Sequence, residues 1–270
     1  MPAVPAVPAV PDSADLLTVA EAAARAGGAV LREGQGRPKE IAAKGRMEIT
    51  TWADAAAQTA IVDVVTGSYP EHRIEGEEGA VGDPAADVTW IVDPLDGTSN
   101  YAHGIPFFCV SVAERETGGP LLAGVVYDPL RDECFAAARG HPASMAVSTT
   151  AELARAVVGT GIQNDDPGAI AAFGRRIVSL YGACRGVRVL GSPALVMAYI
   201  ACGRLDGMAQ RDALWAWDVA AGIVLVEAAG GRVTGFDGGP PPLEGRADVV
   251  VSNGLIHDAL LAASQDGPAR

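Results

Sequence analysis

The chain has 270 residues, a hydrophobic content of 49% and a net charge of −13. This length suits one large domain or two small ones, with enough apolar residues for a substantial core. The negative charge argues against a nucleic-acid polymer as partner, because no basic stripe could displace counterions from a phosphate backbone. Apolar stretches such as residues 220–229 are too short and too interrupted to span a membrane.

The four cysteines are scattered along the chain and form no C-x-x-C pair. This spacing argues against a zinc site or a disulfide framework and favours free thiols in a reducing compartment. The sequence does not begin with a basic segment followed by an apolar one, as a secretory signal would. We therefore expect a cytoplasmic protein that does not associate with membranes.

The first half of the chain predicts a mixture of helices and strands. Residues 1–12 are a Pro-Ala-Val repeat, which predicts an extended, disordered tail. Helices are expected over residues 13–32, capped by Ser13 or Asp15, and over residues 53–68. Strands are expected at 73–79 (running into a loop), 88–92, 107–114, 121–127 and 132–138. Residues 13–140 are thus predicted to form an α+β half that carries most of the candidate ligands.

Helix and strand patterns alternate in the second half, residues 141–270, which is therefore predicted to be an α/β unit carrying Asp218 and the specificity segment. Helices are expected at 169–181, 193–202 and 218–229, and strands at 187–190, 232–234 and 249–252. The fold class predicted for the whole chain is α+β.

Several carboxylates stand where elements begin or end. Asp93 and Asp96 follow an apolar strand and lie three residues apart, and Glu77 lies in a glycine-flanked loop. Asp54 and Asp218 stand at the starts of predicted helices. Two like charges this close repel each other unless a cation lies between them. Oxygen ligands without a Cys or His cluster suit Mg²⁺.

Each of these features also has an ordinary structural explanation. An Asp at the start of a helix commonly caps it. A pair of glutamates in a loop is usually solvated. The D-P-L-D segment at 93–96 is common turn chemistry, because Asp bonds nearby backbone and Pro fixes φ. No single feature decides between a metal site and these alternatives.

Four segments together resemble the inositol monophosphatase family. W-I-V-D-P-L-D-G-T-S-N-Y-A-H-G-I-P at 90–106 is similar to its first signature, and W-D-V-A-A-G-I-V-L-V-E-A-A-G-G-R-V at 217–233 is similar to its second. I-E-G-E-E at 74–78 and E-I-T-T-W-A-D at 48–54 are similar to two upstream segments, in the family's order. The resemblance implies a layered αβαβα sandwich, a Mg²⁺-dependent and lithium-sensitive phosphomonoesterase, and a homodimer.

The resemblance also implies a set of metal ligands. Glu77 and Asp93, with the backbone carbonyl of Leu95, would bind a first ion. Asp93, Asp96 and Asp218 would bind a second, and Glu77 would hold a weaker third ion through water.

Three further residues would act on the nucleophile and the phosphate. Thr98, with Asp54 behind it, would orient the attacking water and help to deprotonate it, and the N–H groups of Gly97 and Thr98 would bind the phosphate. Asp54 and the four acidic ligands bring a charge of −5, which two Mg²⁺ reduce to −1 and a third changes to +1. Two to three ions are therefore expected, because a phosphate dianion needs a site that is not negative.

The substrate-binding positions depart from the family pattern. Inositol-binding members carry a Glu shortly before the Asp of the second signature, whereas an apparent extra residue here places Gln210 or Arg211 at that position. Arg211 would favour an anionic or carbonyl-bearing group. Pro193, next to Ala194, offers no N–H to a substrate ring, although proline also suits the first turn of a helix. We therefore expect a small phosphorylated metabolite, with nucleotide, sugar and amino-alcohol phosphates competing with inositol phosphate.

A non-catalytic, metal-binding regulatory protein is the alternative from a different functional class. The complete set of acidic ligands and Thr98 argues against it, since loss of activity usually removes ligands first. The histidines give no support to other chemistry: His103 belongs to the first signature and is expected to shape its loop, and His72, His141 and His257 are isolated and expected to face solvent.

Overall fold

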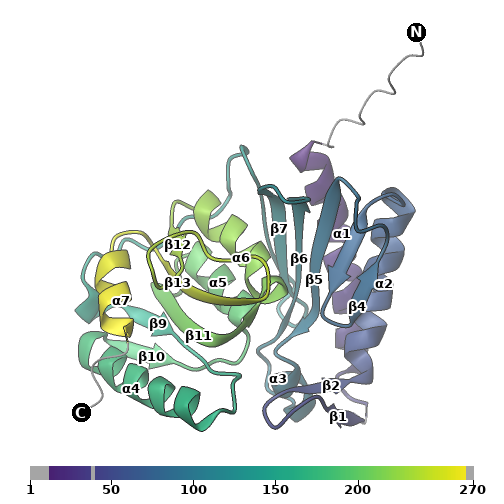
Figure 1. Cartoon of the computed structure of the whole chain (residues 1–270). Helices are drawn as coiled ribbons and strands as arrows, with labels where there is room; N and C mark the ends of the chain where they lie inside the picture. Colours follow the sequence, from purple (N-terminus) through teal and green to yellow (C-terminus); the bar gives the residue numbers. More distant parts are fainter. Residues whose placement is uncertain (1–11, 38–39, 266–270) are drawn as a thin grey trace.

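The computed structural model describes residues 12–37 and 40–265, with only the backbone of Asp212 and Ala213. The expectation for residues 1–12 lies outside this part of the chain except at Asp12, whose side chain caps the first helix. Five layers stack across the molecule in the order helix, sheet, helix, sheet, helix (Figure 1). The predicted α+β fold with a layered αβαβα sandwich is confirmed.

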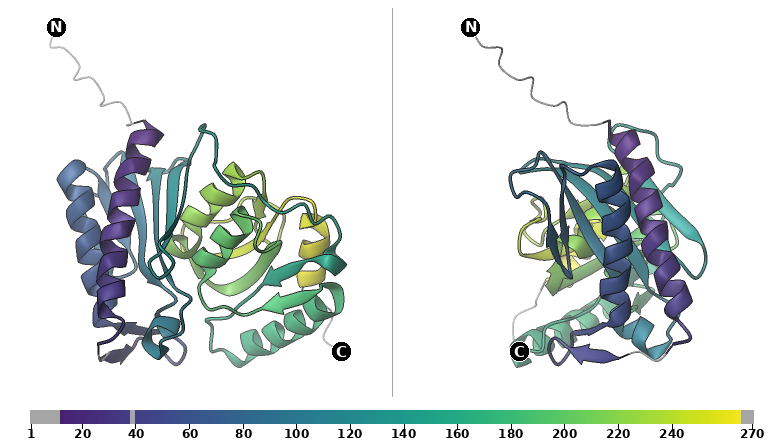
Figure 2. Two further views of the ribbon diagram at one scale, coloured as in Figure 1. Left: turned by 180° about the vertical axis from the view of Figure 1, so that it is seen from behind. Right: turned by 90° about the vertical axis from the view of Figure 1, so that its right-hand side faces the viewer.

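Helices α1 (Ser13–Gly34) and α2 (Trp52–Ser68) form the first layer and lie side by side over one face of the larger sheet (Figure 2). Their buried residues are mostly small or apolar, so the helices can approach the strands closely. A Cβ on Gly28 would lie 2.5 Å from the ring of Tyr127, which explains the glycine at this position of α1.

The larger sheet has six strands, and within it β3 and β5 run parallel while the other neighbouring pairs are antiparallel. β5 lies inside the sheet and is buried along its whole length, as its apolar sequence requires. Across the sheet the strands are β4 (Gly79–Val81), β3 (Arg73–Gly76), β5 (Val88–Asp96), β6 (Cys109–Glu116), β7 (Leu121–Asp128) and β8 (Glu133–Ala138).

Helices α5 (Pro193–Ala201) and α6 (Ala216–Ala228) fill the space between the two sheets. Nearly all of their residues are buried, which explains their almost continuous apolar sequences. The smaller sheet has five strands in the order β10 (Gly186–Arg188), β9 (Val157–Gly159), β11 (Gly207–Trp215), β13 (Arg246–Ser252) and β12 (Arg232–Thr234). Helices α4 (Pro167–Ala183) and α7 (His257–Ser264) cover its outer face.

The helices expected from sequence begin and end within two residues of those observed. The strand expected at 88–92 is longer than predicted, because it continues to Asp96. The sequence does not predict β11, because its polar residues interrupt any apolar alternation, and it does not predict α7. Also not predicted are the short elements β1 (Ile41–Ala43), β2 (Ile49–Thr51), β4, β9, α3 (Thr98–His103) and η1 (Leu153–Arg155). Elements of three residues are too short to show a period.

Two histidines expected at the surface are buried, so that expectation is wrong for them. The ring of His72 stacks on Tyr69 and its Nδ1 accepts a hydrogen bond from the indole of Trp90. His257 lies between the hydroxyl groups of Thr234 and Ser252, each 2.9 Å from a ring nitrogen. The third, His141, is exposed as expected. None of the described helices is long and apolar enough to cross a membrane.

The larger sheet buries one carboxyl group that has no partner among the described residues. Glu114, in β6, lies on the same face as Val110 and Val112, which pack in the core beneath α1 and α2. It is fully buried, and neither carboxyl oxygen has a hydrogen-bond partner. Burial raises the pKa of Glu114 well above its usual range, because the charged form is poorly solvated there.

Replacing Glu114 with Met should therefore stabilise the fold. The raised folded-state pKa means that Glu114 destabilises the protein increasingly as pH rises above the unfolded value of about 4.3. We expect Glu114→Met to raise the free energy of unfolding in urea by about 1–3 kcal/mol at pH 8, and by less at pH 5. Glu116→Met, at the half-exposed end of the same strand, is the control. A Glu114→Met protein less stable than wild type at pH 8 would contradict this account.

Candidate active site

The end of β5 brings two carboxylates to the same face of the larger sheet. Asp93 pairs with Ser111 and Asp96 with Cys109, so three steps along β5 face two steps along β6. In a regular strand, side chains three residues apart point to opposite faces; the extra residue changes this alternation. The Leu95 N–H donates a 2.9 Å hydrogen bond to Asp93 Oδ1, which holds this irregular segment together.

Asp54 and Asp218 act as helix-capping residues from the third position of their helices, not from the cap itself. Asp54 Oδ2 accepts hydrogen bonds from the Thr51 N–H and hydroxyl, at 2.8 Å and 2.7 Å. Asp218 Oδ2 accepts from the Trp215 N–H at 2.6 Å. Both residues therefore stabilise the start of a helix, although from its third position. Each uses one carboxylate oxygen for this and leaves the second available for other contacts.

Asp96 connects the two halves of the molecule. Its Oδ2 accepts hydrogen bonds from the hydroxyl of Ser192 and the N–H of Ala194, both at 2.7 Å. Ser192 stands just before α5 without a side-chain capping hydrogen bond, and Pro193 occupies the first turn of this helix, where its missing N–H is not needed. The N–H of Ala194 thus points at Asp96, so Ala194 influences the site through this carboxylate.

The residues present fit a divalent cation. Asp93, Asp96 and Asp218 are each at least 95% buried and have ligand oxygens within 4.8 Å of one another. One oxygen of each carboxylate accepts a hydrogen bond from the protein, namely Asp93 Oδ1, Asp96 Oδ2 and Asp218 Oδ2. These hydrogen bonds do not involve the other oxygen of each group. A buried set of three carboxylates needs a compensating cation, and hard oxygen donors suit Mg²⁺.

Glu77 follows β3 and lies beside the cluster of Asp93, Asp96 and Asp218, where it contacts Lys44, a residue to which the sequence interpretation gave no role. The Glu77 N–H donates to the Val92 carbonyl, which places Glu77 beside the end of β5, and its side chain lines the same cavity as Asp93. Lys44, in the hairpin of β1 and β2, contacts Glu77 at 3.0 Å and Glu78 at 2.6 Å. A single lysine ahead of the E-I-T-T segment was the sequence signal for this contact.

Thr98 and Gly97 lie next to the acidic cluster, at the start of α3. The Thr98 hydroxyl is 3.0 Å from both Asp54 Oδ1 and the Leu95 carbonyl, and can donate its proton to either. Gly97 has φ +96°, and a Cβ there would lie 3.1–3.2 Å from two carbonyl oxygens and the Phe108 side chain. Glycine is therefore required at this turn, which lines the same cavity as the carboxylates.

Burial and mutual repulsion raise the pKa values of the clustered carboxylates when no cation is present. Burial raises the pKa of Asp96 to about 7, against the effect of its donors Ser192 and Ala194. Burial, and then the charges of neighbouring carboxylates, raise the pKa values of Asp93 and Asp218 well above their usual range. Burial also raises the pKa of Glu77, and Lys44 opposes this shift. A cation would reverse these effects.

Gln210 and Arg211 lie on opposite sides of β11. Gln210 is buried and lines a small cavity of about 60 Å³ together with Pro193. This cavity shares Gln163 and Gly191 with the cavity of about 100 Å³ that contains the carboxylates. Arg211 instead lies 3.4 Å from Asp248 and stacks over the ring of Phe236. Of the two candidates for the specificity position, Gln210 is the one beside the acidic site.

Removing one charge from the cluster should stabilise the ion-free protein. A folded-state pKa raised above the unfolded value of about 4 means that the fold loses stability as pH rises from the unfolded pKa to the folded pKa, which is about 7 for Asp96, and that the loss is complete above the folded pKa. We expect Asp218→Asn, measured in EDTA, to melt at a higher temperature than wild type at pH 8, with a smaller difference at pH 5. Mg²⁺ should raise the melting temperature of wild type more than that of the variant.

Asp237→Asn, at an exposed aspartate, is the matched control for this charge change. If Asp218 acted as a helix cap and nothing more, Asp218→Asn would leave the melting temperature unchanged or lower it at pH 8. Either result would contradict the electrostatic account.

Comparisons with known proteins agree with this geometry. The model of the "Inositol monophosphatase family" matches residues 12–269. An inositol-1-monophosphatase from Mesorhizobium japonicum and the Nus factor SuhB of Salmonella typhimurium are each 38% identical to this chain, over 93% of it and 96% of the relative. The structure of an inositol monophosphatase from Anabaena (Nostoc) sp. PCC 7120 superposes with a TM-score of 0.81 and 36% identity, covering 93% of this chain and 95% of that one.

Proposed function

Because the chain belongs to the inositol monophosphatase family, we propose that it hydrolyses the phosphate monoester of a small metabolite in a Mg²⁺-dependent reaction. The observation that carries this proposal is the buried cluster of Asp93, Asp96 and Asp218, which adjoins a hydroxyl and a glycine turn suited to water and phosphate. Mg²⁺ prefers oxygen ligands, and the described residues that line the carboxylate cavity include no Cys or His.

The acidic residues would hold two to three Mg²⁺ ions. Asp93, Asp96 and Asp218 lie closest together, and Glu77 and the Leu95 carbonyl line the same cavity. When bound, the ions would lower the pKa of a water molecule and offset the charge of the phosphate. The carboxylates are buried away from bulk water, and their negative charge would retain the ions.

Thr98 and Asp54 form the proton path. The Thr98 hydroxyl can accept a hydrogen bond from the attacking water while it donates to Asp54 Oδ1 at 3.0 Å. Burial raises the pKa of Asp54, against hydrogen bonds from Thr51 and Thr98, which makes it a stronger base than an exposed aspartate. Asp54 is itself fixed by Thr51, so its orientation toward Thr98 is set before substrate arrives.

The phosphate would bind against the backbone of Gly97 and Thr98. The turn at Gly97 opens α3, and the N–H groups there have no carbonyl partner within the helix. Backbone donors next to a cluster of cations suit a phosphoryl group, because its oxygens can use both.

Phosphate release from an aryl phosphate tests the proposal. We expect Mg²⁺-dependent turnover by the wild type, a loss of kcat of about 10²-fold or more in Asp93→Asn, and a loss of about 10²-fold in Thr98→Val, because each removes a group that acts in the transition state. Asp237→Asn should match the wild type. Full activity in Asp93→Asn would show that the carboxylate cluster is not the reaction centre.

Gln210 is the residue we propose for substrate selection, together with Pro193, because both line the cavity adjoining the carboxylates. A neutral amide both donates and accepts hydrogen bonds, whereas a carboxylate accepts the protons of ring hydroxyls. This favours a nucleotide, sugar or amino-alcohol phosphate over inositol phosphate as the substrate. Arg211 contacts Asp248 and Phe236 on the other side of β11 and would have no part in substrate selection.

Exchanging this residue should change substrate preference. We expect Gln210→Glu to raise the kcat/KM for inositol phosphate, relative to that for a nucleoside monophosphate, by about 10-fold, the effect of one hydrogen bond in a specificity pocket. Arg211→Glu is the matched control and should leave the ratio unchanged, since Arg211 lies on the other side of β11. A larger shift in Arg211→Glu than in Gln210→Glu would move the specificity position to Arg211.

A regulatory, non-catalytic role is the second candidate, and the relative named Nus factor SuhB favours it. We expected no nucleic-acid partner, and with a relative of that name only the net charge of the chain supports this expectation. If the wild type turns over no phosphate monoester with Mg²⁺, only this candidate remains. The homodimer and the cytoplasmic location stay predictions, as does the division of the chain near residue 140.

A further inference from the structure

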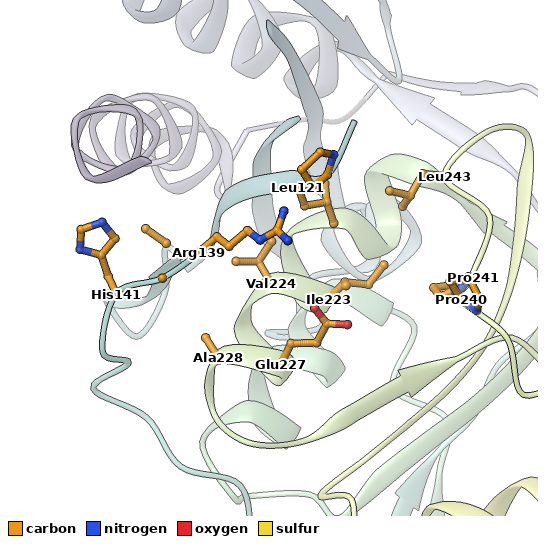
Figure 3. A pocket seen from close by; sticks show the side chains of 13 residues that line it. Leu121, Arg139, His141, Ile223, Val224, Glu227, Ala228, Pro240, Pro241 and Leu243 are labelled. Atoms are coloured by element: carbon orange, nitrogen blue, oxygen red, sulfur yellow. The ribbon is translucent and has the colours of Figure 1, made fainter. Parts of the chain in front are cut away.

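A second cavity lies apart from the carboxylates. It is a groove of about 520 Å³ between the β7–β8 edge, α6 and the loop before β13 (Figure 3). Its walls are mostly apolar, with Leu121, Ile223, Val224 and the Pro240–Pro241 pair. The side chains of Arg139 and Glu227 lie in its middle. A groove of this size suits an extended ligand that is mostly apolar.

One end of this groove lies at the start of α1. The Ser13 hydroxyl donates to the Arg139 carbonyl at 3.2 Å, and Asp12 lies 3.5 Å from His141 Nε2. Arg139 and His141 both line the groove. The first described residues of the chain, Asp12 and Ser13, therefore lie at the edge of the groove.

The sequence of residues 1–11, M-P-A-V-P-A-V-P-A-V-P, has a period of three and carries no charged side chain. A polyproline II helix has three residues per turn, so this period places all prolines on one ridge and all valines on another. At ~3.1 Å per residue the segment spans about 34 Å, which is longer than a groove of this volume requires. Its backbone is rich in carbonyl acceptors, which the Arg139 guanidinium can serve.

We propose that the groove is a polyproline II binding site and that residues 1–11 of the same chain occupy it. An attached segment has an effective concentration on the order of millimolar, so an affinity of about 0.1 mM keeps the groove filled in about nine-tenths of the molecules. The same affinity between separate molecules at micromolar concentration leaves it almost empty. The segment thus covers the apolar wall formed by α6 and the Pro240–Pro241 loop without any requirement for a partner.

The mobility of residues 1–11 in the ¹⁵N-labelled full-length protein tests this assignment. We expect the backbone amides of Ala6, Val7 and Ala9 to show heteronuclear NOE values close to those of the helices. Ala228→Arg places a long charged side chain in the groove and should reduce these values to those of a free chain end, and Leu243→Ser should do so in part. Ala171→Arg, on the exposed face of α4, is the matched control and should have no effect.

Each contrary outcome is clear. Amides as mobile in the wild type as in Ala228→Arg would overturn the proposal, provided that both proteins keep the wild-type melting temperature. Reduced mobility that appears only at high protein concentration would place the segment in the groove of a second copy, and would overturn the intramolecular assignment. Phosphatase activity is an independent readout, because none of these positions touches the carboxylate cavity.

Discussion

The repulsion between buried carboxylates is the interaction on which the rest of the site depends. Asp93, Asp96 and Asp218 are placed within 4.8 Å of one another in a region from which water is largely excluded. Such a cluster is unfavourable in the folded protein unless a cation or protons compensate it. The fold therefore depends on compensation of these charges, and a bound cation would stabilise both the cluster and the arrangement of strands and helices that assembles it.

The fold assembles this cluster from elements that are distant in sequence. The irregular end of β5 supplies two carboxylates, and the first turn of α6 supplies the third. The layered architecture makes this possible, because α6 packs between the two sheets with its first turn beside the end of β5. The capping hydrogen bonds of Asp54 and Asp218 do not compete with a role in the site, since each uses one carboxylate oxygen and orients the other.

Sequence reasoning recovered the helices α1, α2, α4, α5 and α6, most strands of the larger sheet and the carboxylates, because apolar periodicity and charged residues at element ends are local signals. It could not find β11, since Gln210 and its polar neighbours break the alternation that marks a strand. Nor could it choose between Gln210 and Arg211, because the choice depends on which face of β11 each side chain occupies. The contact between Lys44 and Glu77 and the burial of His72 and His257 are likewise tertiary properties that no short segment encodes.

The hydrogen bonds from Ser192 and Ala194 to Asp96 have a consequence for protein engineering. Through them, the orientation of Asp96 in the first half of the chain depends on the first turn of α5 in the second half. A hybrid that joined residues 13–140 of this chain to the corresponding portion of a relative would have to preserve that hydroxyl and that amide at the junction. Without them, the Asp96 carboxylate would lose its fixed orientation. The hybrid could then gain the substrate specificity of the relative but would bind the ions less tightly.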